Sequence, residues 1–227
     1  MIPNSSPSIP DLIKANVSRD LLMGIEDAMD AGAMRAFLAT KDLAAGHRKN
    51  ALGQMRHFHM NELFNEALLA AGAEMVQLKG NGVVVGESGL FKLSRLNISE
   101  KAWNNGNRSV TRRKLAEANQ DMAHLLQPSL FGPVEVSSGT LFIVACFSGS
   151  LSHQPEKPVR IYVAVPDEYM EGWLFREPLD IFLARYDEMP KQADLAQPKL
   201  KTKLLEKKPQ SNRRDPGQDD AERQTAS

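Results

Sequence analysis

Hydrophobic residues recur at steps of three and four positions in two stretches of the first half of the chain. The first stretch follows Ser18, a residue type that often caps helices, and its hydrophobic positions run from Leu22 to Phe37. The second runs from about Leu52 to Ala71 and is followed by Gly72, a residue type typical of helix C-termini. We therefore predict two amphipathic helices in this part of the chain.

Shorter hydrophobic runs separated by glycines follow at residues 75–79, 83–85 and 90–98. Their tight spacing predicts two or three short antiparallel strands. Residues 140–147 are hydrophobic on both faces of an extended chain, which predicts a buried central strand. Residues 160–165 are expected to form its antiparallel neighbour.

Two further helices are predicted in the second half of the chain. One extends from about Arg108 to Leu126 and is ended by Pro128, which cannot continue a helix. The other lies in the sequence WLFREPLDIFLARY, residues 173–186, and Pro178 marks a start near its first turn.

Together these elements predict an α+β fold, with an antiparallel sheet of about five short strands flanked by three to four helices. Residues 1–10, rich in Pro and Ser, are expected to form a flexible lead-in, and residues 11–190 a single domain. Residues 191–227 contain no aromatic residue and three prolines among many charged side chains. Such a segment buries too little hydrophobic surface to fold, so we expect a disordered charged C-terminal tail.

The composition favours a cytoplasmic protein. Cys146 is the single cysteine, so no internal disulfide can form, as is usual in a reducing compartment. Because Cys146 lies inside a hydrophobic run, we expect a small core residue rather than a nucleophile. The N-terminus lacks the basic and hydrophobic regions of a signal peptide, and the longest hydrophobic run, residues 141–147, is too short to span a membrane.

The formal net charge is zero, but the charges are distributed unevenly along the chain. Residues 41–120 carry 12 basic and 7 acidic groups, whereas residues 121–190 carry 4 basic and 10 acidic groups. This asymmetry indicates either an anionic partner for the basic section or two sections that neutralise each other.

Basic residues gather at the predicted start of the third helix. They are Arg108, Arg112, Arg113 and Lys114, and the earlier Arg48 and Lys49 belong to the same basic section. Cations oppose the positive end of the helix dipole, whereas a bound phosphate would compensate both the cations and the free backbone N–H groups. We therefore predict these six residues as a nucleic-acid-binding surface, with a solvated helix end as the alternative.

Two of the five histidines, His57 and His59, lie in the second predicted helix. Positions two apart on a helix differ by about 200°, so these side chains are expected to point to nearly opposite sides. His59 does share a face with Glu62, but the chain has neither a His-Glu-x-x-His motif nor paired Cys-x-x-Cys motifs. This segment predicts a polar helix face rather than a metal site.

Acidic residues follow the strand predicted at residues 160–165. Carboxylates such as Asp167 and Glu168 at a strand end can hold Mg²⁺ for phosphodiester cleavage, with Glu62 as a further ligand. A metal-dependent nuclease or related hydrolase is therefore an alternative function.

The leading hypothesis is a non-catalytic nucleic-acid-associated or regulatory protein that contacts the phosphate backbone. The expected partners are DNA or RNA, or another protein, and the sequence predicts no metal, small-molecule cofactor or membrane partner. A second alternative is a protein–protein adaptor without nucleic-acid binding.

Overall fold

Helices form the first part of the chain and strands much of the rest in the computed structural model, which describes residues 7–76, 82–100, 102–126, 135–149 and 154–187. The helices are α1 (Ile9–Asn16), α2 (Arg19–Thr40), α3 (Ala45–Ala70), α4 (Val110–Ala116) and α5 (Leu179–Ala184). The strands are β1 (Glu74–Met75), β2 (Val85–Ser88), β3 (Phe91–Ser99), β4 (Gly139–Phe147), β5 (Arg160–Pro166) and β6 (Trp173–Pro178). Short 3-10 helices flank α4: η1 (Trp103–Arg108), η2 (Glu117–Asn119) and η3 (Asp121–Leu126). The described residues belong to one compact unit, Met1–Met189.

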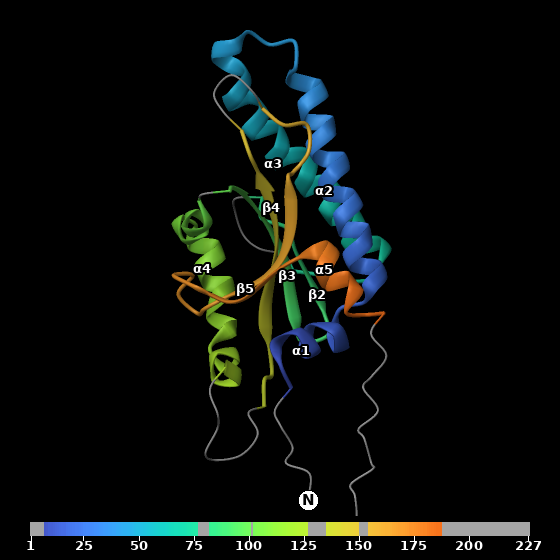
Figure 1. Cartoon of the computed structure of the whole chain (residues 1–227), viewed down its shortest axis with the longest axis vertical. Helices are drawn as coiled ribbons and strands as arrows, with labels where there is room; N and C mark the ends of the chain where they lie inside the picture. Colours follow the sequence, from blue (N-terminus) through green and yellow to red (C-terminus); the bar gives the residue numbers. More distant parts are fainter. Residues whose placement is uncertain (1–6, 77–81, 101, 127–134, 150–153, 188–227) are drawn as a thin grey trace, which may run out of the picture. The chain divides into compact units, whose positions relative to one another are not determined.

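Helices α2 and α3 pack along each other as a long helical hairpin (Figure 1). The hydroxyl of Ser18 caps α2 by accepting a hydrogen bond from the backbone N–H of Leu21 at 3.2 Å. Gly72 follows α3 with a φ of 73°, in the left-handed region that glycine adopts without strain. Both predicted helices are confirmed, although α3 begins at Ala45 because residues 45–51, largely exposed, continue the helix beyond the hydrophobic stripe.

The strands form one six-stranded sheet in the order β1-β2-β3-β4-β5-β6. All neighbouring strands are antiparallel except β3 and β4, which run parallel, with Phe91 opposite Gly139 and Ser99 opposite Phe147. The prediction of an α+β fold is confirmed, but the prediction of an antiparallel sheet is wrong, because the sheet is mixed.

The parallel pair results from the long connection between β3 and β4. A tight turn would return the chain antiparallel, whereas the connection here contains η1, α4, η2 and η3, and β4 starts beside the start of β3. The carboxyl ends of β3 and β4 therefore lie side by side.

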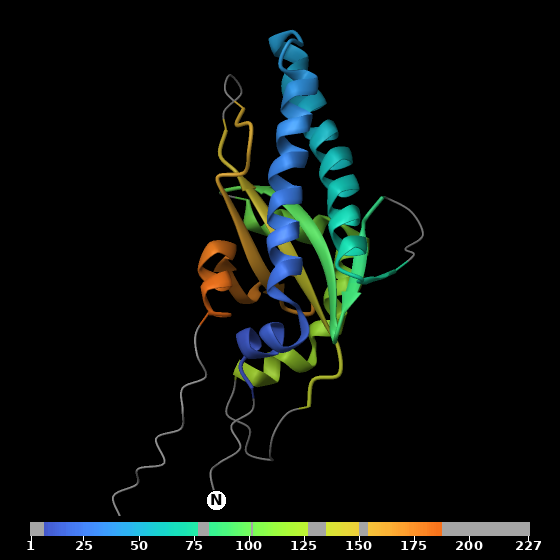
Figure 2. The ribbon, with the colours of Figure 1, turned by 90° about the vertical axis from the view of Figure 1, so that its right-hand side faces the viewer.

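The sheet separates two hydrophobic cores (Figures 1 and 2). Helices α1, α2, α3 and α5 cover one face, and α4 covers the other. Strand β4 is buried along its whole length, and its side chains alternate between the cores, with Ile143 in the first and Val144 in the second. This confirms the predicted buried central strand, and β5 is its antiparallel neighbour as predicted.

The helix predicted from Arg108 to Leu126 is divided in the structure. Regular α-helix covers only α4, and the segment continues as η2 and η3. The buried side chain of Asn119 accepts a hydrogen bond from Thr140 N at 2.6 Å and donates to the carbonyls of Thr140 and Pro166 at 3.1 and 2.9 Å. These bonds hold the segment against β4 and β5 and favour the local departure from α-helical geometry.

The last helix was predicted within residues 173–186 with its start near Pro178, and α5, which begins at Leu179, confirms that start. Residues 173–178 form the edge strand β6, paired with β5, and only residues 179–184 are helical. Pro178 provides the transition, because proline lacks an N–H and is tolerated just before a helix begins.

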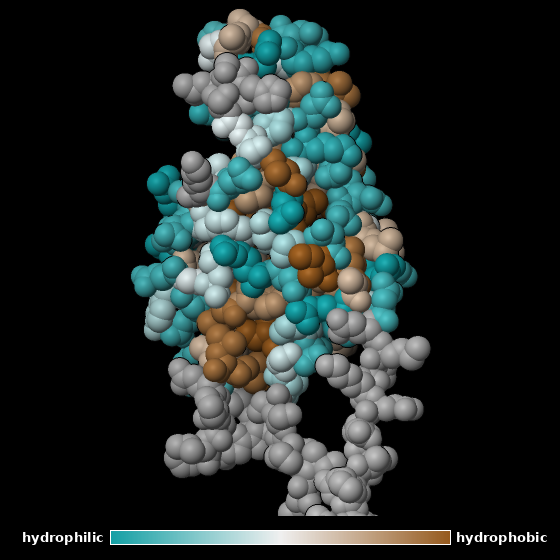
Figure 3. Space-filling model, in the orientation of Figure 1, coloured by the Kyte–Doolittle hydropathy of each residue, from teal (hydrophilic) through white to brown (hydrophobic). Residues whose placement is uncertain are grey.

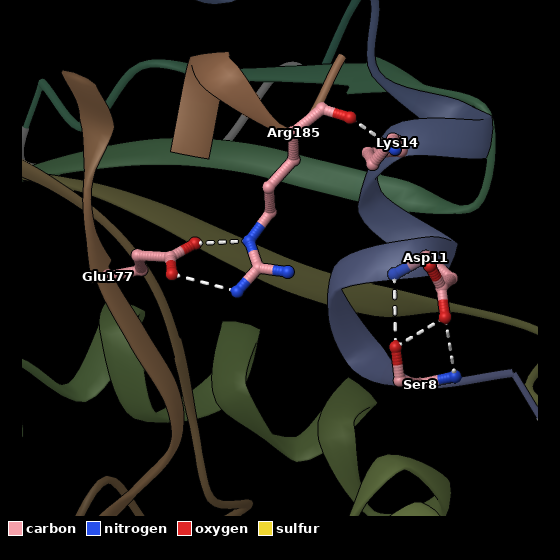
Figure 4. A network of polar contacts seen from close by, with 5 residues as sticks. All are labelled: Ser8, Asp11, Lys14, Glu177 and Arg185. Carbon is pink, nitrogen blue, oxygen red and sulfur yellow. Dashed lines mark hydrogen bonds and ion pairs between the residues drawn. The ribbon is translucent and has the colours of Figure 1, made fainter. Parts of the chain in front are cut away.

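The first helix, α1, extends into residues 1–10, for which a flexible lead-in was predicted. Ser8 caps α1 in a reciprocal arrangement with Asp11, in which the Asp11 backbone N–H donates to the Ser8 hydroxyl at 3.4 Å (Figure 4). Lys14 donates to the backbone carbonyl of Arg185, whose guanidinium holds the Glu177 carboxylate at 2.7 and 2.8 Å. The contact of Lys14 therefore attaches α1 to the residue that follows α5. Residues 1–6 and the predicted tail, residues 191–227, lie outside the described residues.

Most of the face seen in Figure 3 is polar, and its largest hydrophobic patch lies at the lower left, beside residues drawn in grey. Among the described residues, no helix has the length and hydrophobicity needed to cross a membrane.

Candidate anion-binding cleft

An open cleft lies at the carboxyl ends of the parallel strands β3 and β4, beside α3. Its volume is about 410 Å³. The lining residues come from α3, from the ends of both strands, from η1 and from the chain after β4: Lys49, Gly53, Arg56, Asn97, Ile98, Ser99, Asn105, Phe147, Ser148, Gly149 and Gln154. We call this set the basic cleft, because its charged members are Lys49 and Arg56.

Arg56 is the most constrained charged group of the basic cleft. It is only 7% exposed, and its guanidinium carbon lies 3.9 Å from the centroid of the Phe147 ring. One terminal nitrogen donates to the backbone carbonyl of Pro155, whereas Nε has no acceptor among the described residues. A buried donor without an acceptor costs about 1–3 kcal/mol. The site therefore holds a positive group whose hydrogen-bonding capacity is not fully used.

No carboxylate among the described residues neutralises this group. The ion pairs in the described part of the chain do not include Arg56, and no acidic residue lines the basic cleft. Burial lowers the pKa of Arg56 to about 10, so the guanidinium remains protonated at neutral pH. An anion bound in the cleft would compensate this charge.

Arg95, on β3, supports the basic cleft from within the fold. It is 5% exposed and donates three hydrogen bonds to neutral acceptors: Nε to Asn61 Oδ1 at 2.8 Å, Nη1 to Asn97 Oδ1 at 3.0 Å and Nη2 to the His57 carbonyl at 2.7 Å. Because Asn97 lines the cleft, its orientation there is set by Arg95. Burial, together with the nearby Arg112, lowers the pKa of Arg95 to about 9.

Arg112 adds a further positive charge near this arginine. Its side chain is partly buried, its Nε has no acceptor in the described part of the chain, and burial lowers its pKa. Burial first, and then the charges of Arg95 and Arg112, lower the pKa of His57. The region next to α3 is therefore strongly electropositive, and it favours the neutral form of His57.

The basic residues predicted from sequence occupy different environments. Arg108, Arg113 and Lys114 are exposed, whereas Arg112 turns inward. Arg48 donates from Nε and Nη2 to the carbonyl of Leu43 at 3.2 and 3.0 Å, so its guanidinium holds the turn between α2 and α3.

Lys49 is exposed and is the predicted residue that lines the basic cleft. Asn105 lines the same cleft from η1, so the structure brings the start of α3 next to the segment that carries Arg108. At the start of α4, the Ser109 hydroxyl already accepts a hydrogen bond from the Arg112 backbone N–H at 3.4 Å. The helix N-terminus proposed from sequence is therefore already partly hydrogen-bonded by its own cap. In the cleft, by contrast, Arg56 Nε has no acceptor among the described residues.

The six basic residues predicted as the binding surface do not include Arg56 and Arg95, although both carry a recognisable signal. Arg56 occupies a position of the buried stripe of α3, four residues after Leu52 and four before Met60. Arg95 follows Phe91 and Leu93 at the same two-residue step on β3, on the face that packs against the first core. In the buried stripe of α3 and in the alternating pattern of β3, a charged residue at a hydrophobic position indicates a buried charge.

The acidic residues of the nuclease alternative are occupied otherwise. Asp167 Oδ1 accepts hydrogen bonds from the backbone N–H groups of Tyr169 and Glu171 at 3.1 and 2.9 Å, which shapes the turn between β5 and β6. Glu62 pairs with Arg35 at 3.1 Å and lies 3.6 Å from His59 Nδ1. In the described part of the chain, no three His, Cys, Asp or Glu residues group as metal ligands.

Comparison of the chain with protein-family models, curated proteins and solved structures finds no match. The functional interpretation therefore depends on the chemistry of the basic cleft and its surroundings.

Proposed function

We propose that this protein is a non-catalytic nucleic-acid-binding protein that holds backbone phosphate at the carboxyl ends of β3 and β4. The observation that carries the proposal is Arg56, a buried guanidinium that lines an open cleft. Among the described residues it has no carboxylate partner, and its Nε has no acceptor. Guanidinium groups bind phosphate by charge-assisted hydrogen bonds that are about twice as strong as neutral ones.

Exposed cations on the segment that follows Asn105 favour a polyanionic ligand over a small carboxylate. Exposed Arg108, Arg113 and Lys114 lie on η1 and α4, the segment that follows the Asn105 side of the cleft. A nucleic acid whose phosphate occupies the cleft could reach these cations with neighbouring phosphates, and several such contacts are typical of backbone binding.

Salt-dependent binding tests this proposal. Fluorescence anisotropy of labelled single-stranded DNA, RNA and duplex DNA is measured with the full chain over a range of salt concentrations. We expect affinity to fall steeply with salt, and Lys49→Gln and Arg113→Ala each to reduce the slope by about one phosphate contact.

Lys92→Gln is the matched control for these variants. Lys92→Gln removes one positive charge, as Lys49→Gln does. Lys92, however, lies near the opposite end of β3 from the basic cleft, 3.9 Å from Glu87. We expect its salt slope to equal that of the wild type. If no nucleic acid binds at low salt, or if Lys92→Gln lowers the slope as much as Lys49→Gln, the proposal is wrong.

A further inference from the structure

The two cations of the basic cleft differ in depth. Lys49 is exposed, whereas Arg56 is 7% exposed and is held between the Phe147 ring and the Pro155 carbonyl. A ligand phosphate that reaches both cations must therefore enter the cleft rather than pass over its rim. From this arrangement, and resting on the proposed function, we infer that the basic cleft binds the terminal phosphate of a single-stranded nucleic acid, so that the protein recognises strand ends.

The geometry of a chain end fits this cleft better than that of an internal linkage. An internal phosphodiester is attached to a nucleoside on both sides, so the strand must leave the site in two directions. A terminal phosphate is attached on one side and needs a single exit. The volume of about 410 Å³ lies in the range of sites that hold small organic ligands, and it suits one nucleotide unit rather than a duplex.

The charge of a terminal phosphate also matches the lining. A phosphomonoester carries about −1.5 to −2 charges at pH 7 and has three free oxygens, whereas an internal diester has one negative charge and two. Two cations therefore suit the monoester. Asn105, Ser99 and Ser148 lie in the same lining and provide side chains that can donate to its oxygens. None of the described lining residues is acidic, so they add no like-charge repulsion of a dianion.

The test compares strands that differ only at their ends. The full chain is titrated with single-stranded DNA of one sequence carrying a 5′-phosphate, a 3′-phosphate or only hydroxyl ends, and with a circular strand. We expect the strand with one of the two phosphorylated ends to bind about tenfold or more tightly than the hydroxyl-ended and circular strands. This difference corresponds to the effect of one charge-assisted hydrogen bond. Free nucleoside monophosphate and inorganic phosphate are added as competitors, and both are expected to compete only weakly.

Two variants connect the preference to the basic cleft. Lys49→Gln changes an exposed side chain, so it should leave the fold intact and reduce the preference for the phosphorylated end. Arg56→Lys keeps the charge but shortens the donor, and it should reduce the preference further, with circular dichroism used to confirm folding. Lys92→Gln should retain the full preference.

The outcomes separate the inference from the proposed function. Equal, salt-sensitive binding of all strands would overturn the strand-end inference and leave nucleic-acid binding in place. Free nucleotide that binds as tightly as the phosphorylated strand would identify a nucleotide site and would also overturn it. Lack of binding to any strand at low salt would overturn both.

Discussion

The packing of α2 against α3 predicts that two glycines of one helix respond oppositely to the same substitution. A Cβ atom placed on Gly32 would lie 2.8 Å from Met60 Cα, 2.9 Å from Met60 Cγ and 3.0 Å from Met60 N. A Cβ atom placed on Gly24, which lies earlier in the same helix, would have no atom within 4 Å. We therefore expect Gly32→Ala to destabilise the protein and Gly24→Ala to stabilise it.

The magnitudes follow from helix propensity and steric overlap. Alanine is more favourable than glycine in a helix interior by about 1 kcal/mol, so Gly24→Ala should raise the free energy of unfolding by roughly 0.5–1 kcal/mol. Gly32→Ala gains the same amount, but overpacking typically costs about 1–3 kcal/mol. Because the close atoms include the backbone of α3, a side-chain rotation cannot remove the overlap. The cost should lie near the upper limit and leave a net loss of about 2–2.5 kcal/mol.

Urea unfolding followed by far-ultraviolet circular dichroism measures both effects. The midpoint should move to higher urea for Gly24→Ala and to lower urea for Gly32→Ala, with unchanged slopes. If Gly32→Ala raises the midpoint as Gly24→Ala does, then the two helices do not approach closely at Met60, and the reasoning is refuted.

Three further predictions concern stability. Asn119→Ala should lower the free energy of unfolding by about 2–4 kcal/mol, because buried backbone groups of Thr140 and Pro166 lose their hydrogen-bond partner. The control Asn104→Ala changes an exposed residue and should alter the free energy of unfolding by less than about 0.5 kcal/mol in the same urea assay. Ser8→Ala removes the cap of α1 and should cost about 1 kcal/mol, measured as a lower midpoint of thermal unfolding, and an unchanged midpoint would contradict the cap. The pKa of His57 is lowered in the folded state by burial and by Arg95 and Arg112, so protonation opposes folding. The contribution of His57 to the free energy of unfolding should therefore be largest above the unfolded pKa of about 6.5 and decrease as the pH falls below it. His57→Gln should make the free energy of unfolding less dependent on pH between about pH 7.5 and about pH 5.5. An unchanged pH dependence in this variant would contradict the prediction.

Local patterns in the sequence were sufficient to predict α2, α3 and β4. In each case the periodicity reflects a single buried stripe or a fully buried strand, and the signal does not depend on distant parts of the chain. The end of α3 was predictable for the same reason, since Gly72 adopts a positive φ there.

Features that depend on distant partners were not predictable in this way. The parallel direction of β4 depends on the long connection that contains η1, α4, η2 and η3, and strand periodicity is the same for both directions. The segment 173–178 is short and pairs at the edge of the sheet, with side chains of intermediate burial, so its pattern did not distinguish strand from helix.

The candidate site was predicted in part. Lys49 was predicted from its charge, but the predicted set did not include Arg56 and Arg95, because clustering of basic residues along the chain does not show which of them occupy hydrophobic positions of a helix or strand. Those positions place two guanidinium groups inside the fold, next to a cleft built from segments that are far apart in sequence.

The parallel pairing of β3 and β4 also has a consequence for how the protein folds. The α2–α3 hairpin joins residues close in sequence, whereas the pairing of Phe91 with Gly139 must first close a long loop, which costs chain entropy and slows folding. The basic cleft exists only after these two strands have met. During refolding, ligand binding should therefore recover only with the slowest long-range step. The far-ultraviolet circular dichroism of the α2–α3 hairpin should recover earlier.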